Sequence, residues 1–273
     1  VLWRICLPEQ AFHNMTNYQA ILNTKKKGGG VSAFMLKLLA LISMTIDHFA
    51  AIVILNGKLY GYSTEYFQMA IATEEGHRLL QIYRIFRIIG RLAFPIYAFL
   101  LTEGFRHSHD RKKYFFRLLL MGIVSEVPFD LAFFNQVYNF TVQNIGFTLA
   151  LGVLCMEGMH RFRKNVFYKW AAVLSCAAIA ELIRADYGAL GIFLIAALYN
   201  FRKEKALRLS SGAALSAALS YGSYCFAAVS FLPIAFYNGE KGRISLSRFF
   251  YLYYPLHLGF FYLLIYLGAK ITA

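Results

Sequence analysis

Long apolar runs separated by short polar connections dominate the chain. After the charged and flexible residues 25–30, the pattern predicts about nine membrane-spanning helices, over 34–56, 88–105, 114–134, 146–159, 166–183, 187–199, 206–220, 224–237 and 249–268. Several of these runs approach the length of about 20 residues that crosses a bilayer. A longer polar loop is predicted over 57–85, with its last residues lying along the membrane interface. The expected fold class is all-α, a polytopic transmembrane helical bundle.

The composition is typical of a membrane protein and not of a soluble one. Of the 273 residues, 59% are hydrophobic and 15% are charged, whereas a soluble domain is about a quarter charged. The mean hydropathy is +0.50. The net charge of +14 does not indicate nucleic acid as a partner, because the basic residues fall between apolar runs instead of forming one face. We expect a multi-pass protein of the cell (cytoplasmic) membrane, with the lipid bilayer as its partner.

The distribution of basic residues predicts the orientation. With a cytoplasmic N-terminus, most fall on the inner side, namely Lys25, Lys26, Lys27, Arg106, Arg111, Lys112, Lys113, Arg161, Arg163, Lys164, Arg202, Lys203, Lys205, Arg208, Lys241, Arg243 and Arg248. Fewer fall on the outer side, namely Lys58, Arg78, Arg84, Arg87, Arg184 and Lys270. Cytoplasmic loops carry the excess of Lys and Arg, so the alternation favours this orientation.

The domain organisation is simple. Residues 1–33 form an N-terminal leader and residues 34–270 a single transmembrane domain. Met15 is a candidate initiator, since the chain begins with Val1 and the residues before Met15 lack the pattern of a signal peptide. The four cysteines are scattered without a CxxC pair, so neither a disulfide framework nor a metal site is expected.

Ionisable residues inside the apolar hairpin 87–130 are the first candidates for chemistry. Arg91, Glu103, Glu126 and Asp130 lie within or at the ends of its two runs. A charged group in hydrocarbon is unfavourable by at least a few kcal/mol, so such residues normally face a protein interior or a wet cavity. The hairpin is therefore predicted to line a polar site.

Polar residues from other spans are expected at the same depth. A rise of about 1.5 Å per residue places Asp47 roughly 20 Å along the first span, past the bilayer midplane. The residues expected at that outer level are His48, Arg87, Arg91, Glu126, Asp130, Asn144, Glu181, Arg184 and Asp186. Their convergence at one depth is a stronger signal than any one of them.

Each candidate also has a purely structural interpretation. Asp47 and Arg91 could form an ion pair, and His48 could be a neutral core histidine. Glu126 and Asp130 are four residues apart on one helix face, so a nearby cation such as Arg91, or a bound proton, is expected. His257, which follows Pro255, is interpreted first as structural. The basic loop 106–113 could be a topology signal only, or could bind phosphates.

Four segments in this order resemble the TraX family: KLLALISMTIDHFAAI, RIIGRLAFPIYAFLLTEGFRHSHDRKKYFFRLLLMGIVSEVPFDLAF, QNIGFTLALGVL and DYGALGIFLI. The resemblance covers about 36–265, and the family is named for a membrane protein that N-acetylates conjugative F pilin. The ending YYPLHLGFFYL is distantly similar to the last helix of the membrane acyltransferase-3 group. The resemblance implies a polytopic enzyme that uses acyl-CoA, with an essential histidine in its first helix, here His48, beside Asp47 and with Arg91 in the IGR motif.

The function implied is transfer of an acyl group, expected to be acetyl from acetyl-CoA, to an amine or hydroxyl of an envelope-associated or exported acceptor, either a peptide or a glycan. His48 would be the general base, with Asp47 or Glu126 orienting it and Arg91 stabilising the oxyanion. The acceptor would be bound by Asp130, Arg87, Asn144 and His257. The phosphates of coenzyme A would be bound by Arg106, Arg111, Lys112 and Lys113.

Two other functions fit the same intramembrane charges. The first is a proton-coupled transporter or lipid flippase that uses Asp47, Glu126 and Asp130 to bind protons or a polar substrate. The second is an assembly protein with a well-paired interior. A carrier leaves the thioester of labelled acetyl-CoA intact, whereas an enzyme hydrolyses or transfers the label.

Overall fold

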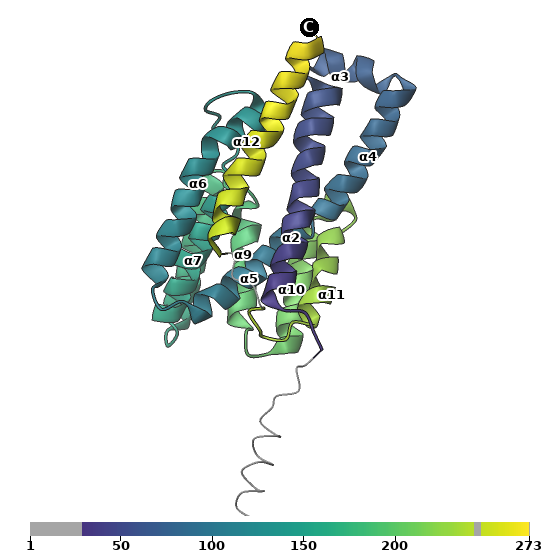
Figure 1. Ribbon diagram of the computed structural model, residues 1–273. Coiled ribbons are helices and arrows are strands. Elements are labelled where there is room, and N and C mark those ends of the chain that lie inside the picture. The colour runs from purple at the N-terminus through teal and green to yellow at the C-terminus, as the bar shows by residue number, and fades with distance from the viewer. Residues whose placement is uncertain (1–28, 243–246, 273) are drawn as a thin grey trace, which may run out of the picture.

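The computed structural model describes residues 29–242 and 247–272, and this part of the chain is almost entirely helical (Figure 1). The helices are α2 (Ala33–His48), η1 (Phe49–Tyr60), α3 (Thr64–Ile71), α4 (Glu74–Gly90), α5 (Ala93–His107), α6 (Arg111–Phe134), α7 (Ile145–Arg161), α8 (Val166–Leu182), α9 (Gly188–Asn200), α10 (Lys205–Leu219), η2 (Tyr221–Ser223), η3 (Phe226–Ser230), α11 (Phe231–Ala235) and α12 (Ser247–Thr272). The prediction of an all-α fold is confirmed. The predicted leader lies outside the described residues as far as residue 28.

The first long helix changes character halfway. The Ser32 hydroxyl accepts a hydrogen bond from the Met35 N–H at 3.3 Å and begins α2, which continues directly into the π-helix η1. His48 is the last α-helical residue before this change. Because π-helical segments are rare and frequent at functional sites, this junction is a position of interest.

The loop predicted over 57–85 is wrong, since η1 extends to Tyr60 and two further helices follow. Ser63 and Thr73 accept hydrogen bonds from the N–H groups of Tyr66 and Gly76 and begin α3 and α4. The acidic residues on which the loop prediction rested, Glu65, Glu74 and Glu75, lie in the first turns of these helices. The helix dipole favours negative charge there. Helix α4 packs against α2 and η1.

A short break at Arg91 and Leu92 separates α4 from α5 within one helical stretch, Glu74–His107. The Ser43 hydroxyl of α2 lies 2.7 Å from the Ile89 carbonyl oxygen and 3.3 Å from that of Gly90, so it bonds the backbone at the break. A Cβ atom on Gly90 would lie 2.1 Å from Asp47 Oδ1. Glycine at this position therefore allows α2 to lie directly against the break.

Three helical stretches of the described residues are long and apolar enough to cross a membrane, Ala33–Tyr60, Glu74–His107 and Phe249–Gly268. The segment predicted as an eighth span is instead η3 followed by α11. Its ten residues, Phe226–Ala235, rise only about 15 Å, roughly half the hydrocarbon thickness. The count of about nine spans and the cytoplasmic N-terminus stay predictions.

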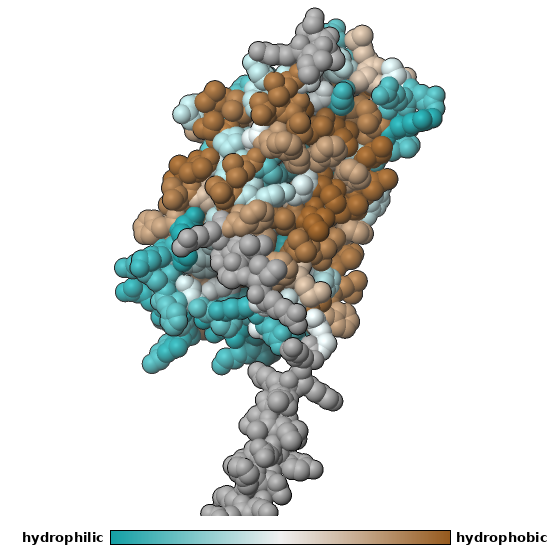
Figure 2. All heavy atoms as spheres, in the orientation of Figure 1, coloured by the Kyte–Doolittle hydropathy of each residue, from teal (hydrophilic) through white to brown (hydrophobic). Residues whose placement is uncertain are grey.

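The surface has an apolar band and one strongly basic end. Figure 2 shows hydrophobic residues across the middle of this face and hydrophilic residues gathered at its lower end. Exposed side chains such as Ile42, Ile85, Phe116 and Leu120 contribute to the apolar surface, as lipid contact requires. The basic end is defined here by the connections α5–α6, α7–α8 and α9–α10, with the cations Arg106, Arg111, Lys112, Lys113, Arg161, Arg163, Lys164, Arg202, Lys203 and Lys205.

Candidate functional site

A pocket of about 270 Å³ lies at the level of the α4–α5 break, away from the basic end. Residues from α2, α4, α5, α6, α7 and α12 line it, together with the turn that precedes α9. Most of the lining is apolar, and its charged or titratable members include Asp47, His48, Arg87, Arg91 and Asp186. An apolar pocket with a few converging polar groups is the usual form of a small-molecule site.

His48 and His257 meet at this pocket although they lie far apart in the sequence. The distance from His48 Nδ1 to His257 Nε2 is 2.6 Å, and the two rings are nearly parallel at 15°. His257 Nδ1 lies 2.8 Å from the Tyr253 carbonyl oxygen. The Tyr253 hydroxyl is 2.7 Å from the Thr45 hydroxyl, which bonds the Leu41 carbonyl and so accepts from Tyr253. These contacts join α2 to α12.

The hydrogen-bond partners determine which nitrogen of His48 is available to a ligand. A carbonyl oxygen only accepts, so His257 Nδ1 carries the hydrogen in its bond to Tyr253. In a neutral ring the other nitrogen, Nε2, is then an acceptor, and His48 Nδ1 donates to it. The lone pair of a neutral His48 therefore lies on Nε2. Such a hydrogen-bonded partner fixes the tautomer of a histidine.

Asp47 forms an ion pair with Arg87, whereas the sequence had favoured Arg91. The distance from Arg87 Nη1 to Asp47 Oδ2 is 2.5 Å, and the two side chains are 25% and 17% exposed. Arg91 lies at the end of α4 and lines the same pocket, and its buried Nε has no hydrogen-bond partner among the described residues. A buried donor without a partner is unfavourable, so Arg91 is available to an anionic or polar ligand.

Asp186 and Tyr187 also line the pocket, and no role for them was predicted from the sequence. The backbone of Tyr187 is left-handed, with φ +65°, and its ring stacks on Phe94 with centroids 3.8 Å apart. The Asp186 backbone carbonyl accepts a hydrogen bond from the Thr148 hydroxyl. The only sequence signal was the expected depth of Asp186, because the turn that presents both residues depends on the packing of α7, α8 and α9.

Glu126, Asp130 and Asn144 do not line this pocket. Asn144 begins α7 and donates hydrogen bonds to Glu126 and to the Gly122 carbonyl, where α6 and α7 approach closely. Asp130 is buried and accepts from the Asn139 backbone N–H at 2.8 Å. Among the described residues no cation pairs with either carboxylate, so the predicted pairing with Arg91 is wrong. These residues hold α6, the following loop and α7 together.

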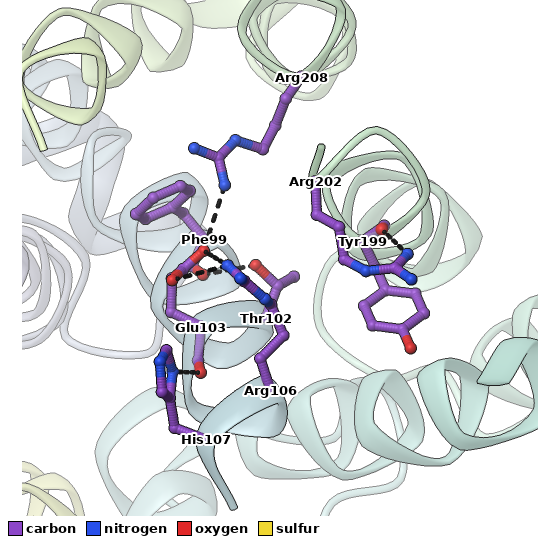
Figure 3. A network of polar contacts seen from close by, with 8 residues as sticks. All are labelled: Phe99, Thr102, Glu103, Arg106, His107, Tyr199, Arg202 and Arg208. Atoms are coloured by element: carbon purple, nitrogen blue, oxygen red, sulfur yellow. Dashed lines mark hydrogen bonds and ion pairs between the residues drawn. The ribbon is translucent and has the colours of Figure 1, made fainter. Parts of the chain in front are cut away.

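The predicted phosphate-binding residues lie at the basic end, and three of the four pair with acids. Glu103 lies between Arg106 and Arg208 (Figure 3), and its Oε1 is 3.1 Å from Arg106 Nη1 and 3.2 Å from Arg208 Nη1. Arg111 pairs with Glu157 at 3.1 Å and Lys113 with Asp110 at 3.3 Å, while Lys112 is exposed. The Lys113 backbone N–H donates to Asp110 and lowers the pKa of that carboxyl. The electrostatic attraction of this loop for phosphate is thereby reduced.

Comparison with known proteins agrees with the resemblance seen in the sequence. Residues 32–265 match the family described as TraX protein. The chain is also 28% identical over 257 residues to the probable fimbrial assembly protein FimC, serogroup H1, of Dichelobacter nodosus, covering 83% of this chain and 93% of that protein. No solved structure matches. Because the family match covers most of its length, the chain belongs to the TraX family of membrane proteins.

Proposed function

We propose that this protein is an integral membrane acyltransferase of the cell membrane. It transfers an acetyl group from acetyl-CoA to an amine or hydroxyl of an envelope-associated or exported acceptor. Membership of the TraX family supports the reaction class, and similarity to a protein named for fimbrial assembly supports an acceptor related to pili. The observation that carries the proposal is the hydrogen bond from His48 to His257, which leaves His48 Nε2 as a base at the wall of a pocket.

The reaction follows from the available lone pair. His48 Nε2 removes the proton from the acceptor nitrogen or oxygen as that atom attacks the thioester carbonyl carbon. The new C–N or C–O bond forms and the C–S bond breaks. The proton taken by His48 then passes to the departing thiolate, which leaves as coenzyme A. No oxidant or reductant is needed, and His48 returns to its initial state.

Charge on the carbonyl oxygen is stabilised by Arg91, which forms no ion pair among the described residues and lies within electrostatic range of Asp186. Arg91 lines the pocket and its Nε is unpaired among the described residues, so its guanidinium takes the oxyanion role. Arg87 is held by Asp47 in an ion pair at the wall of the pocket. Asp47 therefore acts as a positioning residue for Arg87, and no contact with His48 is assigned to it.

Purified protein in nanodiscs, incubated with acetyl-CoA labelled in the acetyl group, tests the reaction class. We expect release of free coenzyme A, with label transferred to water or to an added amine or hydroxyl. Mass spectrometry of exported peptides and surface polymers, from cells with and without the protein, should show a difference of one acetyl group on the acceptor. A thioester that stays intact while the protein moves protons or lipid across the bilayer would support a carrier instead.

Replacing His257 tests whether it positions His48. A glutamine at 257 places an amide oxygen near the position of Nε2 and still accepts from His48 Nδ1, whereas leucine cannot. We expect His257→Leu to lower kcat by about tenfold, the usual effect of losing one hydrogen bond to a catalytic group, with little change in the KM for acetyl-CoA. His257→Gln should retain most of kcat. Equal loss in both variants would indicate a packing role only.

A further inference from the structure

A second cavity adjoins the pocket of His48 on the side of the basic end. It measures about 310 Å³ and is lined by residues of α2, α5, α6, α7 and α12. The two cavities share four lining residues, Tyr97, Met121, Leu149 and Phe250. Ser108, which ends α5, and Arg117, in the second turn of α6, also line it. The two cavities are therefore adjacent, and they lie between the α5–α6 connection and His48.

We propose that this second cavity is the binding site for the pantetheine arm of the acyl donor, with Lys37 and Arg117 contacting its phosphates. The inference rests on the proposed function and replaces the site predicted at residues 106–113. In this arrangement the bulky, anionic nucleotide stays at the basic end and only the acyl end of the thioester reaches His48.

The lining of the cavity has the chemistry of that arm. Pantetheine is a narrow chain that alternates amides with short aliphatic segments, so it needs apolar walls with scattered hydrogen-bonding groups. Leu100, Leu101 and Leu118 supply apolar walls, and the hydroxyls of Tyr114 and Ser108 supply polar groups. A Cβ on Gly104 would lie 2.9 Å from the Tyr114 hydroxyl, so glycine there keeps this wall open. From Tyr97 to Ser108, α5 rises roughly 16 Å, comparable with an extended pantetheine arm.

Two cations at the cavity are not paired with acids. Among the described residues, neither Lys37 nor Arg117 forms an ion pair, unlike Arg106, Arg111 and Lys113. Lys37 Nζ lies 5.7 Å from the centre of the Phe250 ring, on the shared wall. Arg117 is exposed and donates through Nε to the Lys113 carbonyl at 3.1 Å, which leaves its other N–H groups for a ligand. Phosphate is bound well by such cations.

The test measures binding and transfer separately. Protein in phosphatidylcholine nanodiscs is titrated with coenzyme A, and initial rates are measured with acetyl-CoA and with S-acetylpantetheine, which lacks the nucleotide. We expect Lys37→Gln and Arg117→Gln each to weaken coenzyme A binding by about tenfold, the usual effect of losing one charged contact. The rate with S-acetylpantetheine should stay the same. Lys164→Gln, an exposed cation of the basic end outside the cavity, should bind coenzyme A as the wild type does.

The outcomes distinguish this inference from the proposed function. If the wild type binds coenzyme A and both variants bind it equally well, the assignment of Lys37 and Arg117 is overturned and the acyltransferase proposal stands. If binding depends on these cations but no label is transferred, the binding site stands and the reaction is overturned. A wild type that binds no coenzyme A overturns both. Equal loss of rate with S-acetylpantetheine would also overturn the assignment, since that donor has no phosphates near the two cations.

Discussion

Replacing His48 with asparagine is expected to lower the rate of acetyl transfer by about 100- to 10,000-fold, the range that general base catalysis contributes. The base in the proposed reaction is Nε2, because Nδ1 is occupied by the 2.6 Å hydrogen bond to His257. An asparagine amide reproduces the Nδ1–H donor and keeps that hydrogen bond, but has no basic nitrogen. The loss should therefore appear in kcat, measured with labelled acetyl-CoA at saturating donor.

The His48→Asn variant should fold normally, because its asparagine preserves the hydrogen bond to His257. Its unfolding temperature and coenzyme A affinity should stay close to those of the wild type, because the bond between α2 and α12 is retained. His48→Gln, which moves the amide to the position of Nε2, should be equally inactive while losing the contact with His257. A correctly folded asparagine variant with full transfer activity would remove His48 from the mechanism.

Replacing Asp47 with asparagine is expected to lower the free energy of unfolding by about 3 kcal/mol, the largest loss of stability predicted for this chain. Such a loss is typical when one partner of a buried ion pair is removed and the other is left charged. The substitution leaves Arg87 charged and unpaired at the pocket, with side chains only 25% and 17% exposed at positions 87 and 47. For a chain of this size the unfolding temperature should fall by roughly 5–10 °C. Thermal unfolding in detergent, followed by the loss of monodisperse protein, measures it.

Two further variants separate the ion pair from other effects. Adding Arg87→Gln to Asp47→Asn removes the unpaired charge, so the double variant should unfold closer to the wild type than the single one does. Glu74→Gln breaks an exposed pair with Arg78, whose side chains are 83% and 73% exposed. It should change stability by less than about 1 kcal/mol. An Asp47→Asn protein as stable as the wild type would show that the pair does not hold α2 to α4.

The helical fold and most helix positions could be predicted because they depend on local pattern, and so could the presence of Asp47 and His48 at a pocket. Apolar runs and the acids within them are visible in any sequence. The side-chain partners of these residues could not be predicted in the same way. Arg87 and Arg91 lie one turn apart, so spacing alone allowed either to pair with Asp47. The structure pairs Arg87 with the carboxylate where α2 lies against the break, a close approach that Gly90 allows and Ser43 holds.

The prediction of a loop over 57–85 was wrong because local signals in that segment were misinterpreted. Its acidic residues reduced the hydropathy of the segment, and Ser63 and Thr73 were not recognised as helix caps. Glu126 and Asp130 were assigned to the site because they share the expected depth of Asp47. Their side chains instead bond Asn144 and the Asn139 backbone. Position along a helix is thus visible in the sequence, whereas the direction in which a side chain points is not.

The sequence alone determined that this is a helical membrane protein of the TraX type with ionisable residues embedded in its spans, since hydrophobicity and motif order are properties of the chain itself. The tertiary structure alone decided that His257, about two hundred residues away from His48, fixes its tautomer, and that Lys37 and Arg117 line one cavity beside the pocket of His48. Such pairings depend on how α2, α5, α6 and α12 pack together. Packing joins residues at any separation along the chain, so no local pattern specifies it.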